Sequence, residues 1–208
     1  MNRVKAVIFD CDGVMFDSRG ANEAYYNQIL KRFDMKEMDA DESDFTHMHT
    51  VEESIAHIFR DAPGFVDSAH GYRREMSYIP FIAHMKMHPY LITFLQYLRP
   101  AYKTAISTNR TDTMKHVLAT HGLETYFDLV VSALDVSHPK PHPESLEKIL
   151  DHFEIMPQEA LYIGDSEVDE AASEAAGVPL VAYQNKSLEA EYYIEHFKEL
   201  EEIIEGYS

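Results

Sequence analysis

The chain has 208 residues, the length of one domain or of one domain with a modest insertion, and ample for a hydrophobic core. Its 18 basic and 36 acidic side chains give a formal charge of −18, which disfavours binding to nucleic acid or to anionic membranes. The single cysteine, Cys11, excludes an intrachain disulfide and a cysteine-rich zinc site, and a reducing cytoplasm is the simplest compartment.

The first part of the chain predicts one strand followed by helices. The apolar run 4–9 is typical of a buried strand that ends at Asp10. It is too short for a signal peptide, and no other stretch is apolar enough to span a membrane. Helices are predicted at 18–32, 54–60 and 67–78. No strong strand signal occurs from 14 to 80, so this block is expected to be helical.

After residue 80, helices and strands alternate. The predicted strands are 104–107, 129–132, 160–163 and 179–182, and the predicted helices are 88–98, 112–121, 144–153, 167–176 and an acidic amphipathic one at 187–205. This alternation indicates an α/β fold with a parallel, Rossmann-like sheet covered by helices. We expect the core to comprise residues 1–17 and 83–208, with a small helical domain, 18–82, inserted after the first strand.

Polar side chains follow the predicted strands where these strands end. In chain order they are Asp10, Asp12, Thr108, Asn109, Lys140, Asp165 and Asp169. Because ligands bind at the carboxyl ends of the strands in open parallel sheets, we expect these side chains to form one cluster. The cluster would combine carboxylates with a hydroxyl group and an ammonium group.

This set of groups suits phosphoryl transfer in two steps. Asp10 would attack phosphorus to form an acyl phosphate. Asp12, whose side chain points the same way in extended backbone, would protonate the leaving alcohol and then deprotonate water. Lys140 and Thr108 would contact the phosphoryl group. A carboxylate cluster also favours Mg²⁺, which would offset the repulsion between two anionic reactants.

Four segments carry these residues, namely Asp10-Cys11-Asp12-Gly13-Val14, Ile106-Ser107-Thr108-Asn109-Arg110, Lys140-Pro141-His142-Pro143-Glu144 and Gly164-Asp165-Ser166-Glu167-Val168-Asp169. In this order they resemble the motifs of the haloacid dehalogenase-like hydrolase superfamily, in its phosphoglycolate phosphatase and β-phosphoglucomutase branch. The resemblance covers nearly the whole chain, and it implies that the inserted helices are a cap that closes over the site.

The resemblance also implies a role for each motif residue. Asp10 would be the nucleophile and Asp12 the acid and base, with Thr108 and Lys140 on the phosphoryl group. The metal group would contain the Asp10 carboxylate, the Asp12 backbone carbonyl and Asp165. Asp169 would support this group, through Lys140 or through a water molecule.

Other residues allow more than one interpretation. His47 and His49 lie about where the cap loop of this family contacts substrate, but an ordinary surface loop is an alternative. As metal ligands they lack an evident third partner. Asn109 is a candidate substrate contact, and Arg110 a candidate pocket residue, with a structural turn as the alternative for both. Cys11 lies between the two aspartates and is expected to be a core thiol.

The sequence therefore predicts a Mg²⁺-dependent phosphatase that hydrolyses a small phosphomonoester, such as phosphoglycolate or a sugar phosphate. Asp12 favours an ester over a halide substrate, because an alkoxide leaving group needs a proton. Two alternatives remain open: a mutase of the β-phosphoglucomutase type, and a non-catalytic module that keeps the fold. We expect a cytoplasmic monomer or homodimer whose partner is a small phosphorylated metabolite, rather than nucleic acid or a membrane.

Overall fold

The computed structural model describes residues 4–206, and the chain divides into two compact units. One unit contains the residues up to Asp17 and those from Met87 on, and the other is Ser18–Lys86. The chain returns from the helical unit to the larger unit between Lys86 and Met87, which is later than the predicted boundary between residues 82 and 83. The reason is that the turn η2 (Ile79–His84) packs against helix α1 (Arg19–Arg32) and so belongs to the helical unit.

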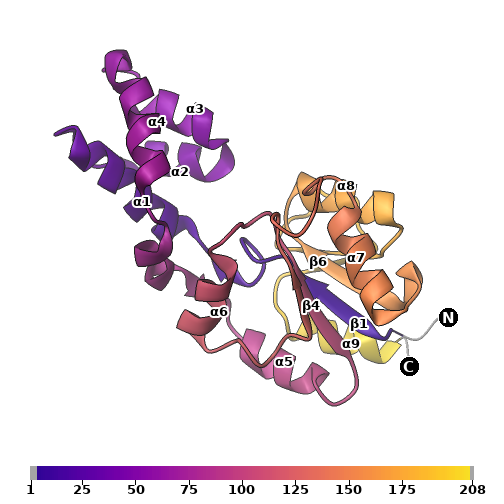
Figure 1. The fold of residues 1–208 in the computed structure, drawn as a ribbon. Helices are drawn as coiled ribbons and strands as arrows, with labels where there is room; N and C mark the ends of the chain where they lie inside the picture. The colour runs from indigo at the N-terminus through magenta and orange to yellow at the C-terminus, as the bar shows by residue number, and fades with distance from the viewer. Residues whose placement is uncertain (1–3, 207–208) are drawn as a thin grey trace. The chain divides into compact units, whose positions relative to one another are not determined.

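The larger unit contains a six-stranded parallel sheet with strand order β5-β4-β1-β6-β7-β8 (Figure 1). Its strands are β1 (Ala6–Phe9), β4 (Lys103–Ser107), β5 (Leu129–Val131), β6 (Ala160–Gly164), β7 (Leu180–Tyr183) and β8 (Tyr192–Ile194). Strands β1 and β6 are buried throughout, as expected for apolar runs covered on both faces. Phe9 aligns with Ile106 and Ile163, so β1 ends level with its two neighbours.

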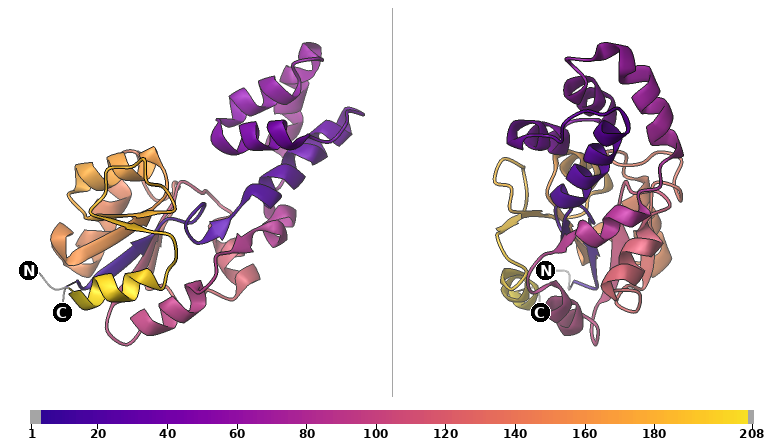
Figure 2. Two further views of the ribbon diagram at one scale, coloured as in Figure 1. Left: turned by 180° about the vertical axis from the view of Figure 1, so that it is seen from behind. Right: turned by 90° about the vertical axis from the view of Figure 1, so that its left-hand side faces the viewer.

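Helices cover both faces of this sheet. They are α5 (Leu91–Leu98), α6 (Met114–His121), α7 (Glu144–Phe153), α8 (Glu167–Ala176) and α9 (Glu199–Gly206). Ile8 packs in a cluster with Leu146 of α7 and Ala172 of α8. Phe9, which points to the opposite face, contacts the rings of Phe94 and Phe197. Figure 2 shows α9, in yellow, on the side of the sheet away from α7 and α8.

The smaller unit is helical and has its own apolar core, which includes Ile29, Ile55 and Phe59. Besides α1, it contains α2 (Ala40–Met48), α3 (Val51–Ile58), the turn η1 (Pro63–Phe65) and α4 (Val66–Glu75). Helix α2 was not predicted, because its acidic sequence lacks an apolar period. A capping box between Asp39 and Glu42 marks its start.

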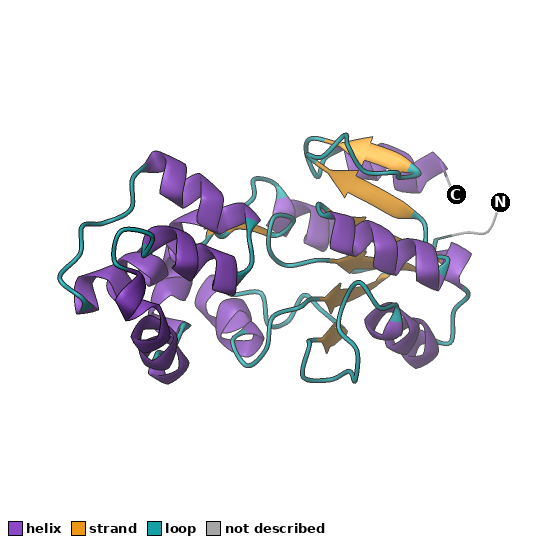
Figure 3. Ribbon diagram, turned by 90° about the horizontal axis from the view of Figure 1, so that it is seen from above, coloured by secondary structure: helices purple, strands orange, loops and turns teal. Residues whose placement is uncertain are grey.

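Two parts of the sequence-based prediction are wrong. A short strand, β2 (Phe16–Asp17), pairs with β3 (Lys86–Met87), although no strand was expected between 14 and 80. The single helix predicted at 187–205 is replaced by β8 and the shorter α9 (Figure 3). Strand β8 pairs with β7 as a parallel edge strand, with Tyr192 aligned with Val181 and Ile194 with Tyr183. Pairing with the sheet therefore outweighs the amphipathic pattern that favoured a helix in this segment.

Candidate active site

Asp10 follows β1 directly, and its carboxylate is buried against the side chain of Lys140. Lys140 Nζ donates to Asp10 Oδ1 at 2.7 Å, and the residues are 6% and 7% exposed, respectively. Since β1 lies between β4 and β6, Asp10 is placed near the middle of the carboxyl edge of the sheet. The structure thus joins the predicted nucleophile to a cation from a loop 130 residues away in sequence.

The ammonium group of Lys140 is shared among several acceptors. Nζ lies 2.6 Å from Asp169 Oδ1, 2.8 Å from Tyr162 Oη and 3.1 Å from the Ser107 carbonyl oxygen. The buried Tyr162 hydroxyl in turn donates to Asp169 Oδ1 at 2.5 Å. Lys140 therefore links Asp169 to Asp10, and support of a metal by Asp169 stays a prediction. The sequence did not predict a role for Tyr162 in the site, because an aromatic residue within a strand is typical of the hydrophobic core.

Burial and ion pairing shift the pKa values of Asp10, Lys140 and Asp169 in opposite directions. Burial raises the pKa of Asp10, and Lys140 only partly offsets that effect. Burial lowers the pKa of Lys140, but Asp10 and Asp169 outweigh it and leave this pKa above its ordinary value. For Asp169, burial is outweighed by Lys140, so its pKa is lowered. One positive charge therefore serves two buried carboxyl groups.

Asp165 lies immediately after β6, close against the backbone of Gly13. A Cβ atom at Gly13 would lie 1.9 Å from Asp165 Oδ2, and Gly13 has a φ of +80°. Only glycine allows both this conformation and this approach. Asn185, which follows β7, donates to the Asp165 carbonyl oxygen at 2.8 Å. Sequence reasoning missed Asn185, although its place after a strand was a possible signal.

Asp169 lies in the first turn of α8 and is fixed by the start of that helix. Its Oδ2 accepts bonds from the Ser166 hydroxyl at 2.6 Å and from the N–H groups of Asp165 and Ser166 at 3.2 Å. A Cβ atom at Gly164 would lie 2.4 Å from Asp169 Cβ, so the glycine makes room for this arrangement. The side chain is 0% exposed.

Carboxylate oxygens of Asp10, Asp165 and Asp169 all lie within 4.8 Å of one another. Burial, followed by the charge of Asp169, raises the pKa of Asp165 to about 7. The charge of Lys140 offsets this rise only in part, and a divalent cation would supply further positive charge. The three oxygen donors fit Mg²⁺, which prefers hard oxygen ligands. Both carboxylate oxygens of Asp169 already accept hydrogen bonds, Oδ1 from Lys140 and Oδ2 from Ser166, so Asp10 and Asp165 are the better placed of the three.

The carboxylate of Asp12 has a different partner, the guanidinium of Arg110. Arg110 Nε donates to Oδ2 at 2.7 Å and Nη2 donates to Oδ1 at 2.6 Å. The Arg110 side chain is 10% exposed and that of Asp12 is 39% exposed. Both carboxylate oxygens therefore accept a charge-assisted bond, which fixes the orientation of Asp12. Sequence reasoning considered Arg110 only as a pocket or turn residue.

Thr108 and Asn109 follow β4, as predicted, but they have different surroundings. Thr108 is 3% exposed, and its Oγ1 accepts the Arg110 N–H at 3.1 Å. Asn109 Nδ2 donates to the Lys140 carbonyl oxygen at 2.8 Å. Asn109 thereby holds the loop that presents Lys140, and its contact with substrate stays a prediction. Cys11 is fully buried, as a core thiol would be, and burial raises its pKa.

The candidate cap residues His47 and His49 belong to the helical unit. His47 lies in the last turn of α2 rather than in a loop, and His49 follows this helix. The His49 ring stacks on Phe45 at 3.7 Å, and its Nδ1 donates to the Phe45 carbonyl oxygen at 2.8 Å. Both histidines are exposed. Their contact with substrate stays a prediction.

The haloacid dehalogenase-like hydrolase family matches residues 7–183 of this sequence. The chain belongs to this family. A haloacid dehalogenase-superfamily hydrolase of subfamily IA from Geobacter sulfurreducens has a similar crystal structure, with 39% sequence identity and a TM-score of 0.90. That similarity covers 97% of this chain and 96% of the Geobacter chain.

Two further relatives are more limited in what they show. Pyrophosphatase PpaX of Bacillus cereus is 36% identical over 101 residues, which are 48% of this chain and 46% of PpaX. The chain thus spans about half the length of the curated relatives it matches. A β-phosphoglucomutase from Clostridium difficile has a TM-score of 0.72 at 19% identity, covering 98% of this chain and 97% of its own. This last likeness shows the fold alone.

These comparisons confirm the predicted superfamily and its α/β fold. They also confirm the prediction that the chain is a hydrolase.

Proposed function

We propose that this chain is a Mg²⁺-dependent phosphatase that hydrolyses a small phosphorylated metabolite through an aspartyl-phosphate on Asp10. The observation that carries this proposal is the buried Asp10 carboxylate, 2.7 Å from Lys140 and within 4.8 Å of an Asp165 oxygen. A carboxylate held beside a fixed cation and a group of hard oxygen donors is suited to attack on phosphorus.

Each residue of the site has a task in this reaction. Lys140 orients Asp10 and stabilises negative charge on the transferred phosphoryl group, while Asp169 and Tyr162 hold Lys140. Thr108 offers a hydroxyl group to the same phosphoryl group. Asp12 protonates the leaving oxygen and then takes a proton from the attacking water. Mg²⁺ held by Asp10 and Asp165 would supply the positive charge that brings an anionic substrate to an acidic protein.

The substrate class follows from family resemblance rather than from a described pocket. Phosphoglycolate and sugar phosphates are the first candidates, and the likeness to PpaX adds pyrophosphate. We propose that residues 18–86 form the cap, with His47 and His49 as candidate substrate contacts. The alternative of a mutase is supported only by the likeness of the fold to that of a β-phosphoglucomutase.

Among residues 4–206, no helix is both long enough and apolar enough to cross a membrane.

The proposal is tested by phosphate release from a metabolite panel, with Mg²⁺ and with EDTA. The panel includes 2-phosphoglycolate, a hexose 1-phosphate and pyrophosphate. We expect release from at least one compound, loss of release with EDTA, and recovery when Mg²⁺ is restored. Isomerisation of the hexose phosphate without free phosphate would show a mutase instead. No turnover of any compound in Mg²⁺ would favour the non-catalytic module.

Changing Arg110 to methionine should slow the hydrolysis of alkyl phosphates more than that of p-nitrophenyl phosphate. Without the guanidinium, Asp12 loses its orientation, and an alkoxide cannot leave without a proton. Because general acid–base catalysis contributes about 10²- to 10⁴-fold, a loss on alkyl substrates of about 10²-fold is expected. The measurement is kcat/KM for both substrates. Arg110→Lys should recover activity only in part, since an ammonium group cannot form the paired bonds. Equal losses on both substrates would contradict this role.

The effect of Mg²⁺ on thermal stability should depend on pH through Asp165. Its pKa is about 7 in the folded protein, against about 3.9 for an unfolded chain. Between these values the metal-free folded state binds more protons, so the contribution of Asp165 to stability falls as pH rises to about 7. Mg²⁺ needs the ionised carboxylate. The gain in melting temperature on adding Mg²⁺ should therefore be full near pH 8 and much smaller near pH 5.5.

The Asp165→Asn variant is the control for this pH effect. It keeps the shape of the side chain but has no proton to lose, so its response to Mg²⁺ should be weak at both pH values. A Mg²⁺ effect in the wild type that is equal at both pH values would show that Asp165 does not hold the metal.

A further inference from the structure

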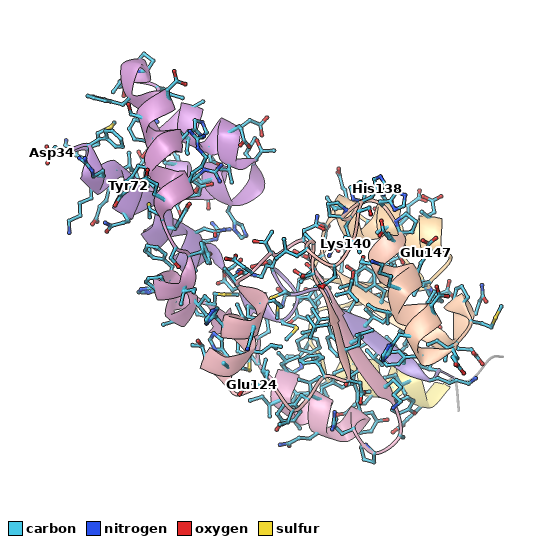
Figure 4. All side chains as sticks on the ribbon, viewed as in Figure 1. Asp34, Tyr72, Glu124, His138, Lys140 and Glu147 are labelled. Atoms are coloured by element: carbon cyan, nitrogen blue, oxygen red, sulfur yellow. The ribbon has the colours of Figure 1, made fainter. Side chains whose placement is uncertain are left out.

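A second group of side chains that could bind a metal lies in the loop before α7 and at the first residue of that helix. His138, His142 and Glu144 each offer one nitrogen or oxygen atom, and these atoms lie within 4.8 Å of one another. His138 Nδ1 is 3.2 Å from Glu144 Oε2, and the centroids of the two imidazole rings are 4.7 Å apart. Both histidines are exposed, whereas Lys140, between them in sequence, is buried and bonds to Asp10. Figure 4 labels His138 and Lys140 on the ribbon. The group is thus separate from the buried carboxylates.

Glu144 is held in place at the start of α7 by its own chain. Its Oε1 accepts the Ser137 N–H at 2.9 Å, and its Oε2 accepts the His138 N–H at 2.9 Å. The bond from Ser137 is the main reason why the pKa of Glu144 is lowered, to about 2. The carboxylate is therefore charged and oriented before any cation arrives.

The loop that carries the two histidines has little conformational freedom. Prolines precede Lys140, His142 and Glu144 in the sequence, and each proline ring fixes one backbone dihedral angle. The Asn109 side chain binds the Lys140 carbonyl oxygen, and the His142 N–H donates to the Pro139 carbonyl oxygen at 3.1 Å. Because the loop is already ordered, bringing the ligands together requires little further loss of entropy.

We propose that His138, His142 and Glu144 form a binding site for one transition-metal ion of the Zn²⁺ type. Two imidazoles and a carboxylate suit Zn²⁺, Ni²⁺ or Cu²⁺, whereas Mg²⁺ prefers oxygen ligands alone. The 3.2 Å separation between His138 Nδ1 and Glu144 Oε2 is near the roughly 3.4 Å between two ligands of a tetrahedral Zn²⁺. The fourth position would be taken by water.

Two existing contacts at this group must give way to the ion. His138 Nδ1 donates to Glu144 Oε2 at 3.2 Å, and this nitrogen must lose its proton before it binds a metal. His142 Nδ1 accepts the Glu144 N–H at 3.3 Å, a long bond. This N–H belongs to the first turn of α7, where backbone donors have no partner within the helix and are readily solvated. Its loss is a small penalty beside the gain of a metal–nitrogen bond. The site would then fix both ends of the segment that presents Lys140.

The test is calorimetric titration of Zn²⁺ into the untagged protein, with Mg²⁺ in excess to occupy the carboxylate group. We expect one Zn²⁺ per chain in the wild type. The His138→Ala/His142→Ala variant should lose this binding by more than the roughly 10- to 100-fold that loss of an outer-shell partner costs. His152→Ala, which removes an exposed histidine from the same helix α7, should bind as the wild type does.

Absorption of Co²⁺ in place of Zn²⁺ gives a second, independent measurement. A four-coordinate ion with nitrogen ligands should give visible bands in the wild type and in His152→Ala, and not in the double variant. Unchanged Zn²⁺ affinity in the double variant would overturn the proposal, as would equal losses in the double variant and in His152→Ala. Neither measurement uses enzyme activity, so the outcome is independent of the proposed phosphatase reaction.

Discussion

Replacing Asp10 with asparagine should abolish phosphate release while the protein stays folded. The amide has nearly the same shape as the carboxylate but cannot attack phosphorus to form an acyl phosphate. No other residue of the site can take over the role of the nucleophile, so the loss of kcat should exceed about 10³-fold. The measurement is phosphate release from the best substrate of the panel, with Mg²⁺ present.

The stability of this variant separates a catalytic from a structural effect. In the metal-free protein, burial raises the pKa of Asp10, so a neutral side chain suits this position. Lys140 keeps its bonds to Asp169 and Tyr162. The melting temperature of Asp10→Asn without metal should therefore equal or exceed that of the wild type.

Asp112→Asn is the matched control, because it makes the same chemical change at an exposed residue. It should keep full activity. Full activity in Asp10→Asn would rule out the covalent mechanism, and loss of activity together with unfolding would leave the catalytic role of Asp10 unsupported. A phosphoryl group detected on wild-type protein by intact mass measurement, and absent from Asp10→Asn, would support the same conclusion.

The main residues of the site were predictable because sheet register places them. Strands β1, β4 and β6 end level with one another, since Phe9 aligns with Ile106 and Ile163. Any residue just after these strands must then lie at one edge, which holds for Asp10, Thr108 and Asp165. Each strand is marked in the sequence by its apolar residues, so a local signal was enough to fix a long-range arrangement.

The partners of these residues were not predictable in the same way. The bidentate pair of Arg110 with Asp12, and the bond from Tyr162 to Asp169, depend on side-chain rotamers across neighbouring strand ends. No short-range pattern encodes such contacts. Tyr162 also shows that a fully buried strand residue can carry a polar function at its tip.

The C-terminal segment shows a second limit of pattern reasoning. Its alternating acidic and apolar residues suggest one amphipathic helix, yet Tyr192 to Ile194 form the edge strand β8. Phe197 is fully buried and stacks on Phe94 and Tyr183. The burial of these aromatic residues in the tertiary structure decides the local structure, and the helical spacing of apolar residues does not predict it.

Replacing Lys140 with methionine should both inactivate and destabilise the protein. Methionine fills similar space but leaves Asp10 and Asp169 without their common cation. Removing one partner of a buried ion pair costs about 3–5 kcal/mol, and here both carboxyl groups are affected. The measurement is denaturant unfolding in EDTA, beside the phosphatase assay in Mg²⁺.

Two further variants identify the origin of this loss. Lys148→Met removes an exposed lysine of α7 that pairs with Glu144 and donates to the Asp135 carbonyl oxygen. It should change neither stability nor activity beyond the small worth of these surface contacts. Lys140→Met/Asp169→Asn removes the charge that is left unpaired at Asp169, so it should recover part of the stability but none of the activity. Were Lys140→Met as stable as the wild type, the shared ammonium group would not hold the two carboxylates together. Partial recovery in the double variant would instead locate the penalty in the unpaired charge of Asp169, and the missing activity in the cation that Asp10 needs.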